Sequence, residues 1–220
     1  MPTYAQLDFG LLPPLESAPM CISLRPPLRD DITTLPECWS RADAALRFCW
    51  YVSQDAQQLH AEEPRATRLR EAFLRACLTE YRAMDEVLPR DLAALGIVTP
   101  PLKIHELRNP LAHLMKELRN FEIHLASSTL TSAKINVVAR WQEKEMEHES
   151  TIWVTEPLTI AKFKQLRNSG HYSDADINTM VDWFNDAQQH WGVHHLAFLA
   201  VQGYCQDLVN NYGLASATDT

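Results

Sequence analysis

The spacing of apolar residues along the chain predicts two amphipathic helices in its first half. From Ser40 to about His60, apolar side chains recur every three or four residues, the period that gathers them on one face of an α-helix. A second stretch with the same period begins at Pro64 and extends to about Leu88. The opposite face of this second helix is expected to carry its basic residues, Arg65, Arg68, Arg70, Arg75 and Arg82. We interpret that face as a solvated surface with ion pairs rather than as a phosphate-contacting surface.

A β-hairpin and a further long helix are predicted in the second half. β-branched and aromatic residues at 134–141 and 150–155 are typical of two strands, and the charged run 143–147 lies between them. Ser173 is expected to cap the start of a last helix, whose apolar period continues through Tyr204.

The amino end has a different character, because seven of the thirteen prolines lie in the first forty residues. Proline breaks helices and central strands, so residues 1–39 are expected to form an arm that is an extended wrap over the domain or partly disordered. Residues 40–214 are expected to form a single helical domain with the hairpin near 134–155, followed by a frayed tail at 215–220. The predicted fold class is mainly α, a helical bundle with a small β-hairpin insertion.

Composition narrows the class of protein. Hydrophobic residues make up 46% of the 220-residue chain and charged residues 22%, as in ordinary soluble globular proteins. The net charge of −8 argues against broad, charge-driven nucleic-acid binding, so any contact with RNA must be local. Five cysteines without a CxxC pair suggest free thiols in a reducing compartment and argue against a zinc ribbon. No leader or membrane-crossing segment is recognised, so we expect a cytoplasmic protein without a membrane partner.

The strongest functional lead is a doubled motif, Leu-Arg-Asn-x-x-x-His-Leu, at residues 107–114 and 118–125. The copies start eleven residues apart, close to three helical turns. In one continuous helix they would therefore fall on nearly the same face, with a drift of about 20°. The polar residues of the two copies are Arg108, Asn109 and His113, and Arg119, Asn120 and His124.

These residue types suit phosphodiester cleavage without a metal. Arginine presents a fixed cationic fork to phosphate, histidine exchanges protons near neutral pH, and asparagine orients both through amide hydrogen bonds. The alternative is structural: a helix that buries a leucine every eleven residues also tends to repeat the polar residues beside it. On that interpretation each Arg, Asn and His is simply satisfied by a neighbour.

The motif resembles that of the HEPN superfamily (higher eukaryotes and prokaryotes nucleotide-binding), helical bundles marked by Arg, four to six residues, then His. Residues 108–113 and 119–124 both have the four-residue spacing, and the likeness covers about twenty residues. A third Leu-Arg-Asn, at 166–168, reaches His171 with one residue too few. The resemblance implies a metal-independent endoribonuclease without a cofactor, in which two subunits bring their Arg-His pairs into a shared cleft. It also raises a toxin–antitoxin or defence setting, with an antitoxin or another protein as partner.

The second copy is our preferred primary site. Asn109 followed by Pro110 looks like a helix cap with proline at the first helical position, so the first copy straddles a helix start. We therefore assign Arg119, Asn120 and His124 as catalytic, and Arg108, Asn109 and His113 as auxiliary groups lining the same cleft. Residues five apart on an ideal helix differ by about 140°, so convergence of Arg and His needs the reach of Arg, a helix distortion or a second subunit. A homodimer with RNA as substrate is therefore expected.

Two other classes remain open. Asp186, His190 and His194 stand four residues apart, which suits metal ligands on one helix face, but no HExxH or Glu-x-x-His pattern completes a site. We favour surface histidines and assign no metal. The other class is a noncatalytic helical module that dimerises or binds a partner through the same face. With six glycines and no Gly-rich loop, a P-loop enzyme is excluded.

Overall fold

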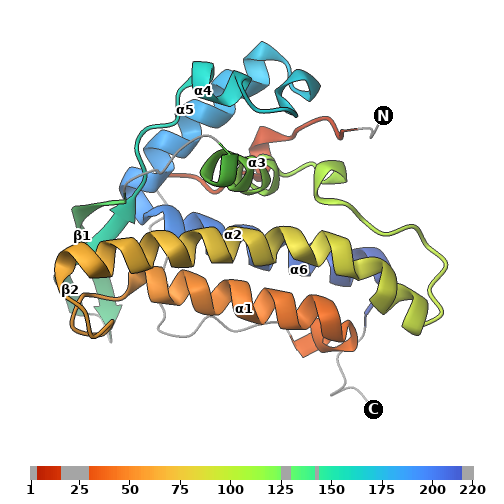
Figure 1. Cartoon of the computed structure of the whole chain (residues 1–220), viewed down its shortest axis with the longest axis horizontal. Coiled ribbons are helices and arrows are strands. Elements are labelled where there is room, and N and C mark those ends of the chain that lie inside the picture. Colours follow the sequence, from red (N-terminus) through yellow and green to blue (C-terminus); the bar gives the residue numbers. More distant parts are fainter. Residues whose placement is uncertain (1–3, 16–29, 125–129, 142–143, 215–220) are drawn as a thin grey trace.

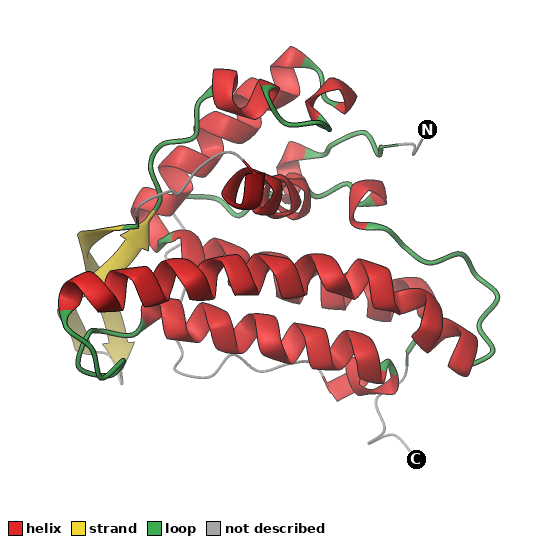
Figure 2. Cartoon of the chain, in the orientation of Figure 1, coloured by secondary structure: helices red, strands yellow, loops and turns green. Residues whose placement is uncertain are grey.

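Two long antiparallel helices form the base of the molecule (Figure 1). They are α1, Pro36–Ser53, and α2, Glu63–Ala94, and α6, Val193–Tyr212, packs against both. The computed structural model describes residues 4–15, 30–124, 130–141 and 144–214. Within these ranges the fold is mainly helical with one small sheet, which confirms the predicted fold class (Figure 2).

The first two helices lie where the apolar period predicted them, but their ends differ. The carboxylate of Asp91 in α2 accepts hydrogen bonds from the backbone N–H groups of Glu37 and Cys38, at 3.1 and 2.8 Å. This cap from a neighbouring helix starts α1 at Pro36 rather than at residue 40. The second helix passes through Pro89 and ends at Ala94, beyond the predicted end at residue 88.

The prediction that Arg70 lies on the exposed basic face of α2 was wrong, because its side chain is fully buried. Its Nε donates to the carbonyl of Gln54 at 2.9 Å, and one terminal nitrogen lies 3.2 Å from the carboxylate of Glu63. The guanidinium also stacks 3.8 Å from the centre of the Trp153 ring. Helical period alone placed Arg70 outside; the aromatic side chain of the hairpin and the loop carbonyl after α1 hold it inside.

The third long helix crosses the base helices. It is α3, Pro110–His124, and it contacts α2 and α6, the helices that carry Phe73 and Phe198. Leu114 and Leu118 are buried there. Leu125 lies outside the described residues.

The predicted hairpin is present, and its strands are longer than predicted. Strand β1, Thr131–Trp141, pairs antiparallel with β2, Lys144–Val154. The charged run 143–147 was expected to separate the strands, and this was wrong, because residues 144–147 pair with residues 138–141. The ladder is formed by backbone N–H and C=O groups, which charged residues carry like any others, so the run does not end it.

The expected last helix is broken in two. After the short helix α4, Ile160–Lys164, helix α5, Asp174–Trp191, begins at the predicted Ser173 cap, whose hydroxyl accepts from the Asp176 N–H at 3.1 Å. It stops at Gly192, where φ is +78° and ψ is 150°, a conformation that is almost confined to glycine. Helix α6 starts at the next residue.

The described part of the arm, residues 4–15, wraps over the domain as one of the two expectations had it. The Ala5 N–H donates to the carbonyl of His105 at 3.0 Å, and the Asp8 N–H to that of Arg108 at 2.9 Å. Leu7 and Phe9 pack against the core. Residues 16–29 of the arm and the tail at 215–220 lie outside the described residues.

The four described cysteines, Cys38, Cys49, Cys77 and Cys205, are buried and free, as expected. Among the described residues, no helix combines the length and apolar composition that crossing a bilayer requires.

We expect Gly192→Ala to lower the free energy of unfolding by about 2–4 kcal/mol. A Cβ at this position would lie 2.8 Å from the His194 ring and 3.1 Å from Ile152, in addition to the positive φ. Gly203→Ala is the matched control, because a Cβ there meets nothing within 4 Å and alanine favours a helix by about 0.5–1 kcal/mol. Denaturant unfolding in which both variants change alike would contradict the break at Gly192.

Candidate functional site

The first copy of the doubled motif lies at the start of α3, and its asparagine caps that helix. The Oδ1 of Asn109 accepts a hydrogen bond from the Leu111 N–H at 2.9 Å, so Asn109 is the predicted cap and Pro110 opens the helix. Arg108 lies outside the helix with its side chain 71% exposed, 3.0 Å from the carboxylate of Asp8. Its charge is therefore directed to the arm rather than to a cleft.

His113 is completely buried and held on both ring nitrogens. Nε2 lies 2.8 Å from the carbonyl of Leu107, and Nδ1 lies 3.1 Å from the hydroxyl of Tyr172. Because a carbonyl only accepts, Nε2 carries the proton in the neutral ring and the tyrosine hydroxyl donates to Nδ1. Burial lowers the pKa of His113 to about 4, with a hydrogen bond to Leu107 opposing it. The structure does not bring Arg108 and His113 together.

The second copy lies where α3 emerges from the protein. All residues from Pro110 to Leu118 are buried, whereas Arg119 and Asn120 are half-buried. A terminal nitrogen of Arg119 donates to the Oδ1 of Asn120 at 3.3 Å. His124 is the last residue of α3, and its side chain lies outside the described part of the structure.

A buried carboxylate, which the sequence analysis did not single out, organises this copy. Glu117 is 1% exposed and accepts from the Nδ2 of Asn120 at 3.0 Å and from the Nδ2 of Asn168 at 3.1 Å. Asn168 belongs to the third Leu-Arg-Asn, which the spacing to His171 had set apart from the motif. The available signal was a charged residue at position 117, between the apolar residues Leu114, Met115 and Leu118 of a helix.

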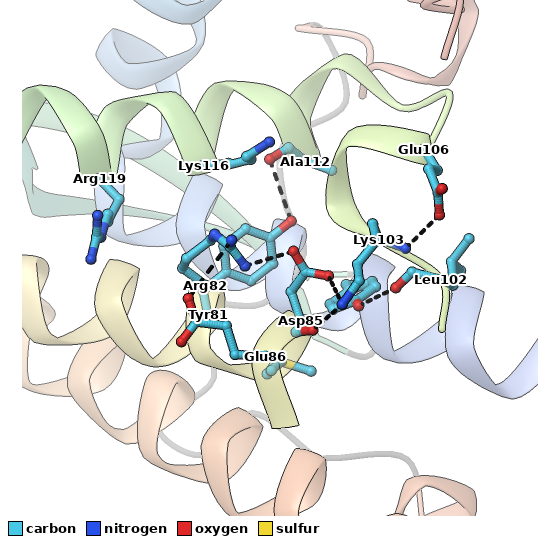
Figure 3. Close-up of polar contacts among 12 residues, drawn as sticks. Tyr81, Arg82, Asp85, Glu86, Leu102, Lys103, Glu106, Ala112, Lys116 and Arg119 are labelled. Atoms are coloured by element: carbon cyan, nitrogen blue, oxygen red, sulfur yellow. Dashed lines mark hydrogen bonds and ion pairs between the residues drawn. The ribbon is translucent and has the colours of Figure 1, made fainter. Parts of the chain in front are cut away.

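Cations surround the same end of α3. Lys116 is buried on α3, and Figure 3 shows it and Arg119 on this helix with Arg82 across from them on α2. Arg82 forms a 2.6 Å ion pair with the buried Asp85, whose other oxygen is 3.5 Å from the Nζ of Lys103. Burial lowers the pKa of Lys116, with the charge of Glu117 opposing and that of Arg82 adding to the shift. Arg82 and Lys103 are paired with carboxylates, whereas the hydrogen-bond partner of Arg119 is an amide oxygen.

Among the described residues, Asp186, His190 and His194 are not placed to bind a metal ion together. His190 is exposed, with Nδ1 2.8 Å from the carbonyl of Asp186, while His194 is buried. In the part of the chain that the structure describes, no three His, Cys, Asp or Glu side chains are placed to share an ion. The expectation of surface histidines was wrong for His194 and His195, because α6 turns inward directly after Gly192. Burial lowers the pKa of His194 to about 3 and that of His195 to about 4.

No protein-family model matches the chain, and no curated protein or solved structure is similar enough to it to count as a match. Its site is therefore interpreted from its own side chains.

Acid is expected to destabilise the fold through its buried histidines. His113 stays neutral in the folded protein down to about pH 4, whereas in the unfolded chain it gains a proton near its ordinary value of 6.5. Its contribution to stability is therefore full above about pH 6.5 and is lost as the pH falls toward 4. His194 and His195 act in the same direction.

Denaturant unfolding at pH 7.5 and pH 5.0 measures this effect. His113→Ala should lower the free energy of unfolding by about 2–4 kcal/mol at pH 7.5, since it leaves the Leu107 carbonyl and the Tyr172 hydroxyl unpaired, and should reduce the pH dependence. His190→Ala, at an exposed position, is the control and should change neither. Equal stability of the unmodified protein at the two pH values would refute the assignment.

Proposed function

We propose that the chain is a metal-independent endoribonuclease of the HEPN type, with Arg119, Asn120 and His124 as its site. The observation that carries the proposal is the state of Arg119. Among the described residues, no carboxylate lies within ion-pair distance of its guanidinium, and its partner is the neutral amide of Asn120. Its Nε–H is buried without a hydrogen-bond partner in the same part of the structure. A guanidinium at a protein surface whose partner among the described side chains is a neutral amide suits a phosphate.

The support beneath Arg119 favours a functional role over a purely structural one. The buried carboxylate of Glu117 accepts a hydrogen bond from Asn120, and Asn120 accepts one from the guanidinium of Arg119. Arg119 is therefore oriented by two successive hydrogen bonds that end on a buried residue. Active sites commonly position their reacting side chains through such supporting hydrogen bonds. Arg108, in the equivalent position of the first copy, is neutralised by Asp8 and has no comparable support.

The chemistry would follow from the side chains alone. His124 would take the proton from a ribose 2′-hydroxyl, the freed oxygen would attack the adjacent phosphorus, and the 5′-oxygen would leave with a proton from a general acid. Arg119 would offset the negative charge that gathers on the phosphate oxygens. On an ideal helix His124 projects about 40° from Asn120 and about 140° from Arg119. We propose that the general acid is the His124 of a second subunit, whose cleft would also bring Arg and His together.

Purified protein is expected to cleave single-stranded RNA in the presence of EDTA. His124→Ala should reduce the rate by ~10²–10⁴, the usual effect of losing a general acid or base. Arg119→Ala should cost a comparable factor by leaving the phosphate charge uncompensated, and circular dichroism should show that both variants keep the fold.

The first copy supplies the matched controls for this experiment. Arg108→Ala removes an exposed arginine of the same motif whose charge is paired with Asp8, and it should change stability by no more than about 0.5 kcal/mol and leave the cleavage rate essentially unchanged. His113→Ala should act on stability first. If the protein leaves varied RNAs intact, or cleaves only with an added divalent metal, the proposal fails. If His113→Ala abolishes cleavage in a folded protein while His124→Ala does not, the other copy is the site.

We further propose that the active species is a homodimer, because one helix face presents too few convergent groups and two-fold assemblies are the commonest soluble oligomers. Light scattering at micromolar concentration should give twice the 25.1 kDa mass of the chain. A monomer mass under conditions where RNA is cleaved would exclude the shared cleft.

The second candidate is a noncatalytic module that dimerises or binds a protein partner such as an antitoxin. The observation that favours it is the exposure of Trp39 and Tyr51 on α1, each at 37%. Exposed tryptophan and tyrosine are common at protein interfaces. Replacing Trp39 with Ala should weaken self-association or partner binding on this hypothesis, and should leave RNA cleavage unchanged on the first.

A further inference from the structure

The ring of Tyr4 occupies a slot lined by side chains from three distant segments. It stacks on His171, with ring centres 4.2 Å apart and planes 5° from parallel, and lies 5.1 Å from His105. Tyr172 presents its edge at 5.4 Å. These three residues and Lys116 form what we call the Tyr4 slot. Such a set of flat neighbours accommodates any planar ring of this size.

The slot also places a hydrogen-bond donor, Lys116, at the edge of the ring. The Nζ of Lys116 donates a hydrogen bond to the Tyr4 hydroxyl oxygen at 3.1 Å and lies 4.8 Å from the ring centre. An ammonium group only donates, so the edge of an occupying ring must carry an acceptor. Lys116 is buried with Tyr4 in place, and a buried ammonium without an acceptor is costly, so an occupant that keeps water from Lys116 must itself supply an acceptor.

The segment that delivers Tyr4 is attached to the protein by backbone hydrogen bonds and by apolar side chains, among them Leu7 and Phe9, that pack against the core, and Tyr4 lies at its beginning, ahead of these contacts. Two backbone hydrogen bonds, from Ala5 and Asp8, join it to the loop before α3. The ion pair between Asp8 and Arg108 is largely solvent-exposed, and such pairs add little stability. Tyr4 itself is half-buried. A ligand that reproduces its stacking and its acceptor can therefore compete for the slot.

We propose that the Tyr4 slot is a binding site for a pyrimidine base of single-stranded RNA, and that Tyr4 fills it in the free protein. Uracil and cytosine are planar six-membered rings with a carbonyl oxygen at the edge, which matches the ring and the acceptor that the slot holds. Proteins commonly bind single-stranded RNA by stacking its bases on aromatic side chains and on histidine. The identification of the ligand as RNA rests on the proposed function.

The position of the slot relative to Arg119 supports this ligand. Lys116 and Arg119 are three residues apart on α3, so their Cβ atoms are neighbours at about 5–6 Å. Figure 3 shows both on this helix, opposite Arg82 of α2. A strand with one base in the slot would therefore place its sugar-phosphate backbone along these cations, toward the proposed cleavage site. A slot-bound base would thus set which phosphodiester reaches Arg119.

Calorimetric titration of the full chain with uridine 5′-monophosphate tests the slot without any cleavage. Tyr4→Ala, which empties the slot, should bind the nucleotide at least tenfold more tightly than the unmodified protein. Tyr4→Phe is the matched control, because it keeps a ring in the slot and should resemble the unmodified protein. Adding His171→Ala to Tyr4→Ala should weaken binding on the order of 5- to 150-fold, the range for losing one stacking platform.

Two further ligands decide what the slot recognises. Ribose 5-phosphate lacks the base and should not bind Tyr4→Ala measurably; if it binds as well as the nucleotide, only the cations are acting and the proposal is overturned. N-acetyltyrosinamide represents an aromatic side chain of a partner peptide. If it binds Tyr4→Ala and the nucleotide does not, the slot accepts protein rather than RNA. Equal nucleotide binding by Tyr4→Ala and the unmodified protein also overturns the proposal.

Photocrosslinking of the unmodified protein avoids the variants altogether. A single-stranded oligonucleotide carrying 4-thiouridine should attach to peptides that contain His105 or His171, and crosslinks found only elsewhere would contradict the slot. The outcomes separate the two proposals. RNA cleavage without nucleotide binding removes the slot and leaves the nuclease, whereas nucleotide binding without cleavage removes the nuclease and leaves the slot.

Discussion

The candidate site depends on one buried carboxylate. Glu117 is 1% exposed, and a charged group with so little access to water must be satisfied by hydrogen bonds. Two asparagine amides, from Asn120 on α3 and Asn168 after α4, provide them. The same carboxylate contributes to the raised pKa of Tyr172, the residue that donates to His113. Glu117 thus links the second copy of the motif to the loop after α4 and to the buried histidine of the first copy.

This connection explains why Arg-Asn pairs recur in the chain without a repeated function. Asn109 caps α3, whereas Asn120 and Asn168 converge on Glu117 although 48 residues separate them in sequence. The three asparagines therefore share a chemical ability, an amide that satisfies a nearby polar group, rather than a site. Of the three arginines in these pairs, Arg108 and Arg167 are exposed, whereas Arg119 is half-buried and donates to the amide oxygen of Asn120. The hydrogen bonds of the asparagines have structural roles, whereas the charge of Arg119 has no structural role that these contacts explain.

The sequence predicted the elements well wherever apolar period was the deciding factor. Helices α1, α2 and α3 and the hairpin were expected at nearly their observed places, and Asn109 and Ser173 were identified as caps. The errors came from contacts between distant segments. Asp91 starts α1 early, and Trp153 draws Arg70 inside, and neither contact has a local signal. The break at residue 192 did have a local signal, the glycine itself, since glycine commonly ends a helix.

The site was predictable only in part, for a reason that lies in the burial of α3. An eleven-residue repeat places both copies on one face of an ideal helix, yet burial changes along that helix: everything up to Leu118 is enclosed, and Arg119 is the first residue to reach water. A polar group in the enclosed part must be satisfied internally, as His113 is by Leu107 and Tyr172. Depth along the helix, rather than the motif, therefore determines which polar side chains must be satisfied internally, and periodicity carries no information about depth.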